Sequence, residues 1–239
     1  MPLLCCLVST PAALAACHEL EAAGFSLCRE PNPEVSGLVL DVPTPQTAEI
    51  PWDRLPEGCR VFGGSLAGVP EGFRVRDLWD DPIYTARNAD ITARCALRLA
   101  TGRLEETLAG LPVLILGWGR IGKCLERHLR SLGAEVCVFA RSPKDRGMLA
   151  ALGSRALDRA EMLAALPGAR LVFNTAPAPI LSEEDTRSCS GLLVDLASRR
   201  GMEDPRALWA RGLPGKLAPL SSGRLIAQTV CRLWKEETP

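Results

Sequence analysis

The fold of this 239-residue chain is decided by one stretch, Leu114-Ile115-Leu116-Gly117-Trp118-Gly119-Arg120-Ile121-Gly122. Three apolar residues lead into glycines spaced as G-x-G-x-x-G, and an amphipathic segment follows to Leu132. In this pattern the first glycine allows a tight turn, the second lets a ligand approach the backbone, and the third lets a helix pack closely on the strand. The stretch therefore predicts a strand, a turn and a helix whose free amides bind the pyrophosphate of a dinucleotide.

The end of the next expected strand, residues 134–140, bears on the identity of that dinucleotide. Proteins that bind NAD place an Asp or Glu there to hold the ribose 2′-hydroxyl. This sequence has no acid at the tip and reads Arg141-Ser142-Pro143-Lys144. Arg141, Ser142 and Lys144 suit a 2′-phosphate, so NADP is favoured over NAD, with NAD left open. The alternative interpretation is a solvated basic turn.

A third strand, expected over residues 170–174, adds cofactor contacts, because ligands of open α/β sheets bind at the carboxyl ends of strands. Asn174, Thr175 and Ala176 stand at that end. The complete set of expected cofactor contacts is Gly117, Trp118, Gly119, Arg120, Ile121, Gly122, Arg141, Ser142, Lys144, Asn174, Thr175 and Ala176.

The rest of the chain predicts an α/β protein with two parts. Strands and helices alternate from residue 84 to 239, which predicts a Rossmann-like, doubly wound parallel sheet. Residues 1–83 predict a second, smaller and truncated α/β lobe on the substrate side. Between them we expect a helix over residues 91–100, capped by Asn88 or Asp90, and a second helical stretch over 104–108. Residues 217–218 read as extended, and residues 222–234 as a closing helix.

Composition excludes several classes of protein. Lys and Arg number 28, as do Asp and Glu, and this zero net charge argues against a nucleic-acid binder. The apolar runs are too short to span a bilayer, and the apolar N-terminus has no basic region before it, so we expect a cytoplasmic protein. The ten cysteines show no C-x-x-C spacing and only two histidines exist, so no metal site is expected.

Charge is unevenly distributed between the two predicted parts. Residues 1–83 carry five basic and twelve acidic side chains, whereas residues 84–239 carry 23 basic and 16 acidic ones. A basic second part suits an anionic ligand. Mutual attraction of two packed lobes is the alternative explanation.

Three further stretches carry a resemblance to a known family. They are Asn174-Thr175-Ala176-Pro177-Ala178-Pro179-Ile180-Leu181, Val194-Asp195-Leu196-Ala197-Ser198-Arg199, and Gly212-Leu213-Pro214-Gly215-Lys216-Leu217-Ala218-Pro219. In this order behind the glycine stretch, they resemble the dipicolinate synthase A-subunit family over roughly residues 111–229. More distantly, the architecture is similar to D-2-hydroxyacid dehydrogenases and S-adenosylhomocysteine hydrolases.

The resemblance implies an NAD(P)-dependent oxidoreductase that oxidises a dihydrodipicolinate-type intermediate to dipicolinate during sporulation. The partner that it implies is a flavoprotein-like B-subunit of the same synthase. A small dicarboxylate substrate needs cationic or N–H donors near the nicotinamide. Lys216 is the first expected substrate contact and Arg199 the second, with Ser198 beside it as the third expected catalytic residue. The alternative for each charged residue is a solvated surface charge, and Asp195 is expected only to orient a loop.

The first lobe departs from the family pattern and leaves alternatives open. The family has a Gly-Gly-Asp stretch after its first strand, where this chain has Val8-Ser9-Thr10-Pro11, and its Pro-Thr-x-Glu-Gly is replaced by Asn88-Ala89-Asp90-Ile91-Thr92. One alternative is a divergent, non-catalytic NADP-binding subunit. The other is a dehydrogenase for another small carboxylic acid. The helix over residues 91–100 suits either a homodimer contact or a hinge.

Overall fold

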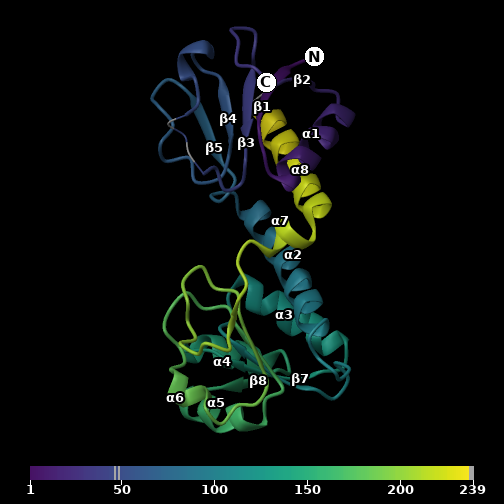
Figure 1. Ribbon diagram of the computed structural model, residues 1–239, viewed down its shortest axis with the longest axis vertical. Helices are drawn as coiled ribbons and strands as arrows, with labels where there is room; N and C mark the ends of the chain where they lie inside the picture. Colours follow the sequence, from purple (N-terminus) through teal and green to yellow (C-terminus); the bar gives the residue numbers. More distant parts are fainter. Residues whose placement is uncertain (46, 48, 237–239) are drawn as a thin grey trace. The chain divides into compact units, whose positions relative to one another are not determined.

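A computed structural model describes residues 1–45, 47 and 49–236, which form two compact units. The first unit comprises residues 1–91 together with the segment from Pro214 onward, and the second comprises Thr92–Leu213. Each unit contains one sheet in which every neighbouring pair of strands is parallel (Figure 1). The prediction of an α/β protein with a Rossmann-like parallel sheet and a second α/β lobe is therefore confirmed, and the sheet of that lobe is also parallel.

The sheet of the second unit has the strand order β11-β10-β9-β6-β7-β8. Its strands are β6 (Pro112–Leu116), β7 (Glu135–Phe139), β8 (Arg155–Leu157), β9 (Leu171–Asn174), β10 (Leu192–Asp195) and β11 (Leu208–Trp209). This order is that of a doubly wound dinucleotide-binding sheet, with the reversal between β6 and β9. The carboxyl ends of these two strands are where such a sheet holds its ligand.

Along the sequence of the second unit, helices alternate with the strands. They are α3 (Arg120–Ser131), α4 (Pro143–Ala151), α5 (Arg159–Ala165) and the short α6 (Glu183–Thr186). The N-termini of the last three are capped by the side chains of Ser142, Asp158 and Ser182. Each cap satisfies an amide that would otherwise have no partner at the helix start.

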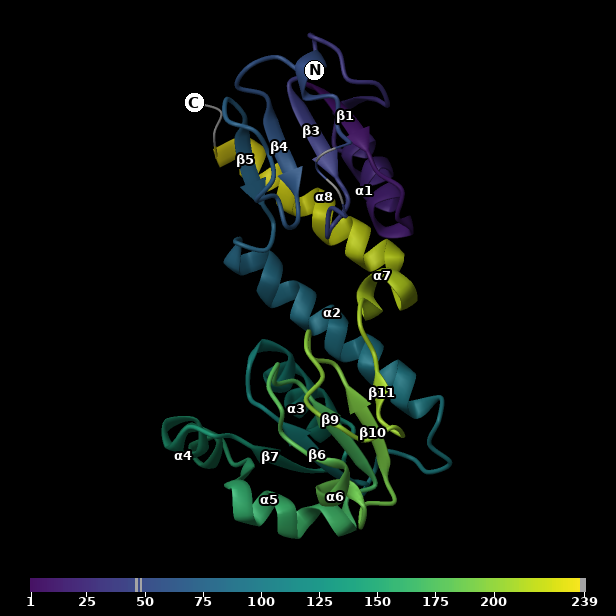
Figure 2. The ribbon, with the colours of Figure 1, turned by 60° about the vertical axis from the view of Figure 1, so that its left-hand side comes forward.

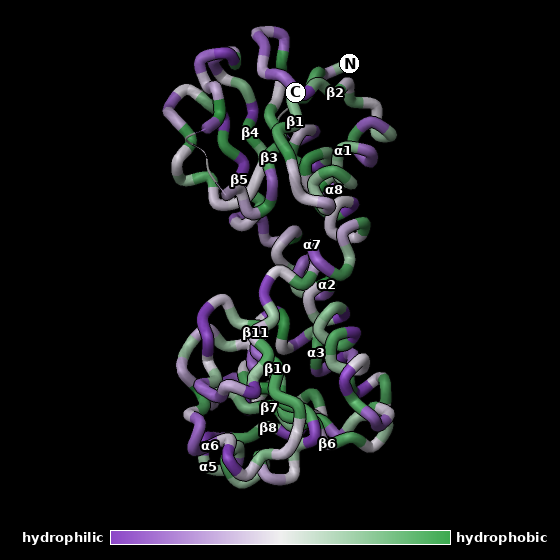
Figure 3. The backbone as a smooth tube through the Cα atoms, in the orientation of Figure 1, coloured by the Kyte–Doolittle hydropathy of each residue, from purple (hydrophilic) through white to green (hydrophobic). Residues whose placement is uncertain are grey.

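The sheet of the first unit has the order β2-β1-β3-β4-β5. Its strands are β1 (Leu3–Leu7), β2 (Ser26–Cys28), β3 (Gly37–Leu40), β4 (Arg60–Gly63) and β5 (Arg74–Asp77). The helices α1 (Pro11–Ala22) and α8 (Pro219–Glu236) lie side by side along one face (Figure 2). Loop residues and a short 3-10 turn, η1 (Trp52–Arg54), pack on the other face. Strands β1 and β10 are hydrophobic along most of their length (Figure 3), as expected for strands in the interior of their units.

The observed division of the chain differs from the predicted boundary at residues 83 and 84. The closing helix α8 belongs to the first unit, because it packs along α1 and completes the core there. Gly223 makes the approach of these helices close: a Cβ atom there would lie 2.5 Å from the carbonyl oxygen of Ala12. Arg232 of α8 also forms an ion pair with Asp81, and the Arg60 guanidinium lies 4.2 Å from the ring centroid of Trp234.

Three predicted elements near the connections differ from the structure. The long helix α2 spans Pro82–Thr101, because the Asp81 carboxylate accepts a hydrogen bond from the Tyr84 amide and caps the helix earlier than Asn88 or Asp90 would. Residues 104–108 are irregular rather than helical. Leu217 ends a short helix, α7 (Leu213–Leu217), where the sequence predicted an extended segment.

All ten cysteines are free thiols, and most are buried in apolar surroundings. Among the described residues, no group of three or more His, Cys, Asp or Glu side chains could hold a metal ion. Within the same residues, none of the helices is both long and apolar enough to cross a bilayer.

The segment between β10 and β11 is fastened by a buried carboxylate. Asp204 is 1% exposed and accepts hydrogen bonds from the Arg206 guanidinium and the Thr186 hydroxyl, each at 2.6 Å. Arg206 also donates to the carbonyl oxygens of Thr186 and Cys189. The hydrogen bonds from Arg206, with that from Thr186, lower the pKa of Asp204 to about 2.

This lowered pKa predicts acid sensitivity of the second unit. The stabilisation is fully present above the unfolded pKa of about 3.9 and is lost as pH falls towards the folded value. We expect Asp204→Asn to lower the free energy of unfolding by on the order of 2 kcal/mol at pH 7 and by much less near pH 2. Urea unfolding at both pH values measures this difference. An equal loss at pH 7 and pH 2 would contradict the electrostatic explanation.

Candidate functional site

The glycine turn lies between β6 and α3, at the switch point of the second sheet. Gly117 has φ of +100°, a conformation that a residue with a Cβ atom rarely adopts. Its own amide donates to the carbonyl oxygen of Phe139, so Gly117 shapes the turn rather than offering a free donor. A Cβ atom at Gly122 would lie 2.2 Å from the carbonyl oxygen of Gly117. The third glycine is therefore required for α3 to begin so close to the strand.

The start of α3 is open to a ligand. Gly119 is its N-cap residue, and no side chain of the described residues caps the helix there, in contrast to α1, α4 and α5. The helical ladder begins with the bond from the Lys123 amide to the Gly119 carbonyl, which leaves the amides of the first turn without helical acceptors. A Cβ atom at Gly119 would meet nothing within 4 Å. Free amides, a positive dipole end and open space fit the pyrophosphate of a dinucleotide.

Trp118 lies between the first two glycines of the turn. Its Nε1 atom is buried and has no hydrogen-bond partner among the described residues. The Lys123 ammonium lies 4.6 Å from the ring centroid of Trp118, within the range of a cation–π contact. This contact keeps a positive charge next to the turn. Arg120 and Ile121, the other predicted contacts, occupy the first turn of α3 and are exposed and partly exposed, respectively.

The basic turn after β7 is braced by Arg146, which the sequence interpretation missed. The Arg146 guanidinium donates to the carbonyl oxygens of Ala140 and Arg141, each at 2.9 Å. Ser142 caps α4 through a hydrogen bond from the Asp145 amide. The side chains of Arg141 and Lys144 are exposed. The backbone of this turn is thus fixed while its two cationic side chains face solvent.

The carboxyl end of β9 contacts the glycine turn directly. The hydroxyl of Thr175 lies 3.1 Å from the Leu116 carbonyl oxygen and 3.2 Å from that of Gly117. Ala176 is partly exposed, and a Cβ atom at Gly117 would lie 3.3 Å from the Cβ atom of Ala176. The predicted residues Thr175 and Ala176 therefore lie beside the turn. Asn174, by contrast, is fully buried and positions the loop rather than facing it.

Asn174 and Asp195 form one buried polar cluster at the ends of β9 and β10. The Asn174 amide nitrogen donates to Asp195 Oδ1 at 2.9 Å. Asp195 also accepts the amides of Ala197, Gly201 and Met202, at 3.0, 2.7 and 3.1 Å. These contacts agree with the expectation that Asp195 orients a loop. That loop, residues 196–202, carries the predicted substrate contacts.

Of the three predicted catalytic residues, two share the second unit. Ser198 and Arg199 are exposed in the loop after β10. Lys216 is exposed on α7 and belongs to the first unit. The structure thus gathers Ser198 and Arg199 on one loop, and it assigns Lys216 to the other unit.

An aromatic and basic cluster beside this loop was missed by the sequence interpretation. Trp209, the last residue of β11, donates from Nε1 to the Ala197 carbonyl oxygen at 3.0 Å. The guanidinium carbons of Arg200 and Arg211 lie 5.5 and 5.2 Å from the centroid of its ring. We call Arg200, Trp209 and Arg211 the Trp209 patch. Their separation in the sequence gave no signal of this contact, which the pairing of β11 with β10 creates.

The corresponding edge of the first sheet is occupied by the chain itself. The Asp41 carboxylate, at the end of β3, accepts hydrogen bonds from the amides and hydroxyls of both Ser9 and Thr10, at distances of 2.6–3.0 Å. Thr10 also caps α1. Flavodoxin-like sheets of this strand order bind ligands between the ends of β1 and β3. In this chain, the hydrogen-bond donors of Ser9 and Thr10 at this edge are already bound to the Asp41 carboxylate.

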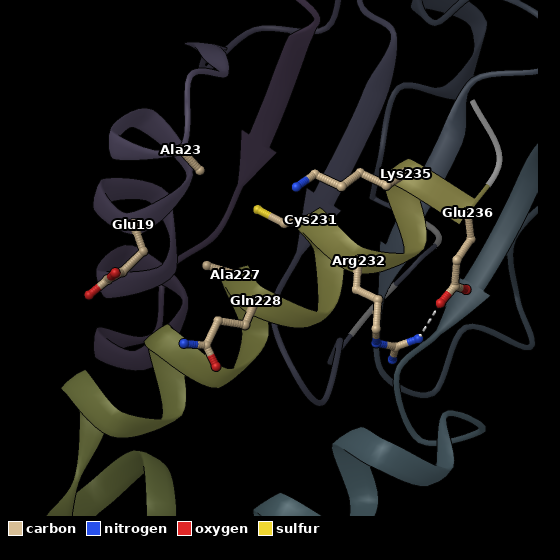
Figure 4. A pocket seen from close by; sticks show the side chains of 8 residues that line it. All are labelled: Glu19, Ala23, Ala227, Gln228, Cys231, Arg232, Lys235 and Glu236. Atoms are coloured by element: carbon tan, nitrogen blue, oxygen red, sulfur yellow. Dashed lines mark hydrogen bonds and ion pairs between the residues drawn. The ribbon is translucent and has the colours of Figure 1, made fainter. Parts of the chain in front are cut away.

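The first unit also has a groove between two of its helices. It has a volume of about 600 Å³ and runs between α1 and α8 (Figure 4). Its lining residues are Glu19, Ala23, Ala227, Gln228, Cys231, Arg232, Lys235 and Glu236. Arg232 is held there by Asp81 and Glu236. None of the predicted site residues lines this groove.

Comparison with known proteins agrees with the observed fold. No protein-family model matches the chain. The A-subunit of dipicolinate synthase from Bacillus subtilis is 29% identical over 200 residues, which cover 77% of this chain and 67% of that protein.

Solved structures extend the similarity to nearly the whole chain. The structure of the dipicolinate synthase A-subunit from Bacillus halodurans has a TM-score of 0.80 at 20% identity, and the match covers 99% of this chain and 97% of that one. A transhydrogenase of Sinorhizobium meliloti matches with a TM-score of 0.70 at 14% identity, covering 92% and 80% of the two chains. By sequence and by fold, this chain is similar to the A-subunit of dipicolinate synthase.

Proposed function

We propose that the chain is an NAD(P)-dependent oxidoreductase that oxidises a dihydrodipicolinate-type intermediate to dipicolinate in sporulation. The observation that carries the proposal is the glycine turn at the switch point, with the uncapped start of α3 beside it. Relatives by sequence and fold include dehydrogenase-type proteins and the A-subunit of dipicolinate synthase, which supports the same class of reaction. Each turnover would convert a dihydropyridine dicarboxylate and NADP⁺ into the aromatic dicarboxylate, NADPH and a proton.

The residues of this chain would bind and orient the two reactants. The first-turn amides of α3 would hold the pyrophosphate, and Arg141 with Lys144 would hold a 2′-phosphate, which favours NADP over NAD. When bound, the nicotinamide supplies the hydride acceptor. Alignment of two rings is then the main task of the protein, because loss of the hydride makes the substrate ring aromatic.

The substrate would lie at the ends of β9 and β10, beyond the nicotinamide. Ser198 and Arg199 are exposed there and can donate hydrogen bonds to a carboxylate. Lys216 is proposed as a third donor from the first unit. Asp195 and Asn174 act as positioning residues, since they hold the loop that carries Ser198 and Arg199. A flavoprotein-like B-subunit is the proposed partner in a synthase, and a homodimer through α2 is a second proposed assembly.

A second candidate function is a non-catalytic NADP-binding subunit. The Asp41 contacts favour it, because they use the donors of Ser9 and Thr10 at the edge of the first sheet. A dehydrogenase for another small carboxylic acid would use the same cofactor site. Activity measurements on a purified protein separate these functions.

Calorimetric titration with NADP and then NAD, followed by turnover of dihydrodipicolinate, tests the proposal. We expect NADP to bind more tightly than NAD. Arg141→Ala should weaken NADP by roughly tenfold or more and leave NAD unchanged, because a charge-assisted hydrogen bond contributes about 1.5–3 kcal/mol. Arg187→Ala is the matched control, because it removes an exposed positive charge of the same unit at a position distant in sequence from Arg141.

The outcomes are distinct. NADP reduction that depends on dihydrodipicolinate supports the enzyme. NADP binding without turnover of any dihydropyridine dicarboxylate favours the non-catalytic role. Absence of binding by either dinucleotide would refute both and leave the glycine turn as a structural feature only.

A further inference from the structure

We propose that the Trp209 patch is a carboxylate-binding subsite of the second unit, in which Arg200 and Arg211 hold one carboxylate of a small dicarboxylate ligand. The identity of that ligand rests on the proposed function. The position of the subsite rests on the structure alone: β11 is parallel to β10, with Asp195 opposite Trp209, so the patch lies at the carboxyl edge of the sheet. Ligands of open α/β sheets bind outside this edge.

The contacts of the two arginines leave their donors available. Both guanidinium carbons lie over the indole ring, at 5.5 and 5.2 Å from its centroid, within the range of a cation–π contact. This contact involves the face of the Trp209 ring. Arg200 and Arg211 form no ion pair within the part of the chain that the structure describes. A guanidinium can donate two parallel hydrogen bonds to a carboxylate from its edge. The patch thus offers exposed, unneutralised donors for an anion.

Trp209 itself is held in place, so the arginines have a fixed support. Trp209 is 42% exposed, yet its Nε1 atom donates a hydrogen bond to the Ala197 carbonyl oxygen at 3.0 Å. That bond joins the patch to the loop that carries Ser198 and Arg199. A side chain positioned before the ligand arrives loses less conformational entropy on binding. The Trp209 patch therefore extends the predicted substrate contacts with a preorganised second group of donors.

The location of the patch separates it from the site proposed for the 2′-phosphate. Arg141 follows β7, and the strands β6, β9 and β10 lie between β7 and β11. Four strand spacings correspond to roughly 19 Å. A ligand held by the patch thus occupies the substrate end of the cofactor crevice rather than the adenosine end. The chemistry that fits is a compact planar dicarboxylate, with the second carboxylate near Ser198 and Arg199.

The test measures the affinity of dipicolinate and of its monocarboxylate analogue, picolinate, for the full chain with NADP present. We expect Arg211→Ala and Arg200→Ala each to weaken dipicolinate by roughly tenfold or more, while picolinate and NADP change by less than about twofold. Arg211→Lys, which keeps the charge but loses the planar fork, should recover only part of the affinity. Arg187→Ala is the matched control and should bind all three ligands as the wild type does.

A second readout makes the test independent of the assumed substrate. Trp209→Phe identifies the part of the tryptophan fluorescence that comes from Trp209, and this part should change on titration with dipicolinate, malonate or phthalate. If dipicolinate binds equally well to the wild type and both alanine variants, the subsite is wrong and the proposed function stands. If Trp209 responds to another dicarboxylate but not to dipicolinate, the subsite stands and the proposed substrate is wrong. If Trp209 responds to none of them, the subsite is overturned.

Discussion

Replacing Gly122 with alanine should abolish detectable NADP binding, a loss of at least roughly a hundredfold. The new Cβ atom would lie 2.2 Å from the carbonyl oxygen of Gly117 and 3.1 Å from its carbonyl carbon. Both are backbone atoms, so the start of α3 must move away from the turn. Overpacking of this kind costs roughly 1–3 kcal/mol, and the displaced amides no longer converge on one anion. Calorimetric titration with NADP and urea unfolding measure the two effects.

Two other glycines provide matched controls for this variant. Gly119→Ala introduces a methyl group that meets nothing within 4 Å, at a φ of −74° that alanine adopts freely. It should leave the free energy of unfolding unchanged and still weaken NADP, because the methyl group occupies the space proposed for the pyrophosphate. Gly147→Ala, also in open space, should leave NADP binding unchanged. If Gly122→Ala binds NADP as the wild type does, the site lies elsewhere.

The second large effect is expected at Gly223, where α8 crosses α1. A Cβ atom there would lie 2.5 Å from the Ala12 carbonyl oxygen, 2.6 Å from the Ala15 Cβ atom and 2.8 Å from the Ala16 nitrogen. None of these atoms ends a flexible side chain, so the helices must separate. We expect Gly223→Ala to lower the free energy of unfolding by roughly 3 kcal/mol or more, at the upper end for overpacking. Thermal and urea unfolding of the full chain measure it.

Ser222, the residue before Gly223, supplies a control whose substitution should not lower the free energy of unfolding. The hydroxyl of Ser222 is buried and has no hydrogen-bond partner among the described residues. Removal of such a group relieves an uncompensated desolvation, so Ser222→Ala should leave the stability unchanged or raise it by about 1 kcal/mol. A Gly223→Ala variant with the unfolding midpoint of the wild type would show that the helices have room to separate.

Local signals in the sequence predicted the fold well. The glycine turn with its flanking strand and helix is present as expected. The start of α2 was predicted too late, although Asp81-Pro82 is itself a cap followed by a proline. The edge strand β11, with two residues, is too short to give a periodic signal.

The parts that could not be predicted depend on long-range packing. An amphipathic pattern shows that α8 buries one face, but it does not show against which sheet. Gly223 was the available clue, since a glycine inside a helix often marks a close approach of two backbones. The cluster of Asn174 and Asp195 and the Trp209 patch require residues that come together only once β9, β10 and β11 are paired.

The return of α8 to the first unit has a consequence for synthesis of the chain on the ribosome. Residues 92–213 are translated between the five strands of the first sheet and the helix that covers it. Until α8 emerges, the apolar face shared by β1, β3 and α1 lacks the partner that buries it. The second unit is continuous in sequence and can fold first. The strands of the first unit are therefore translated before the second unit but receive their covering helix after it, so the nascent first unit exposes apolar surface to aggregation and to chaperones.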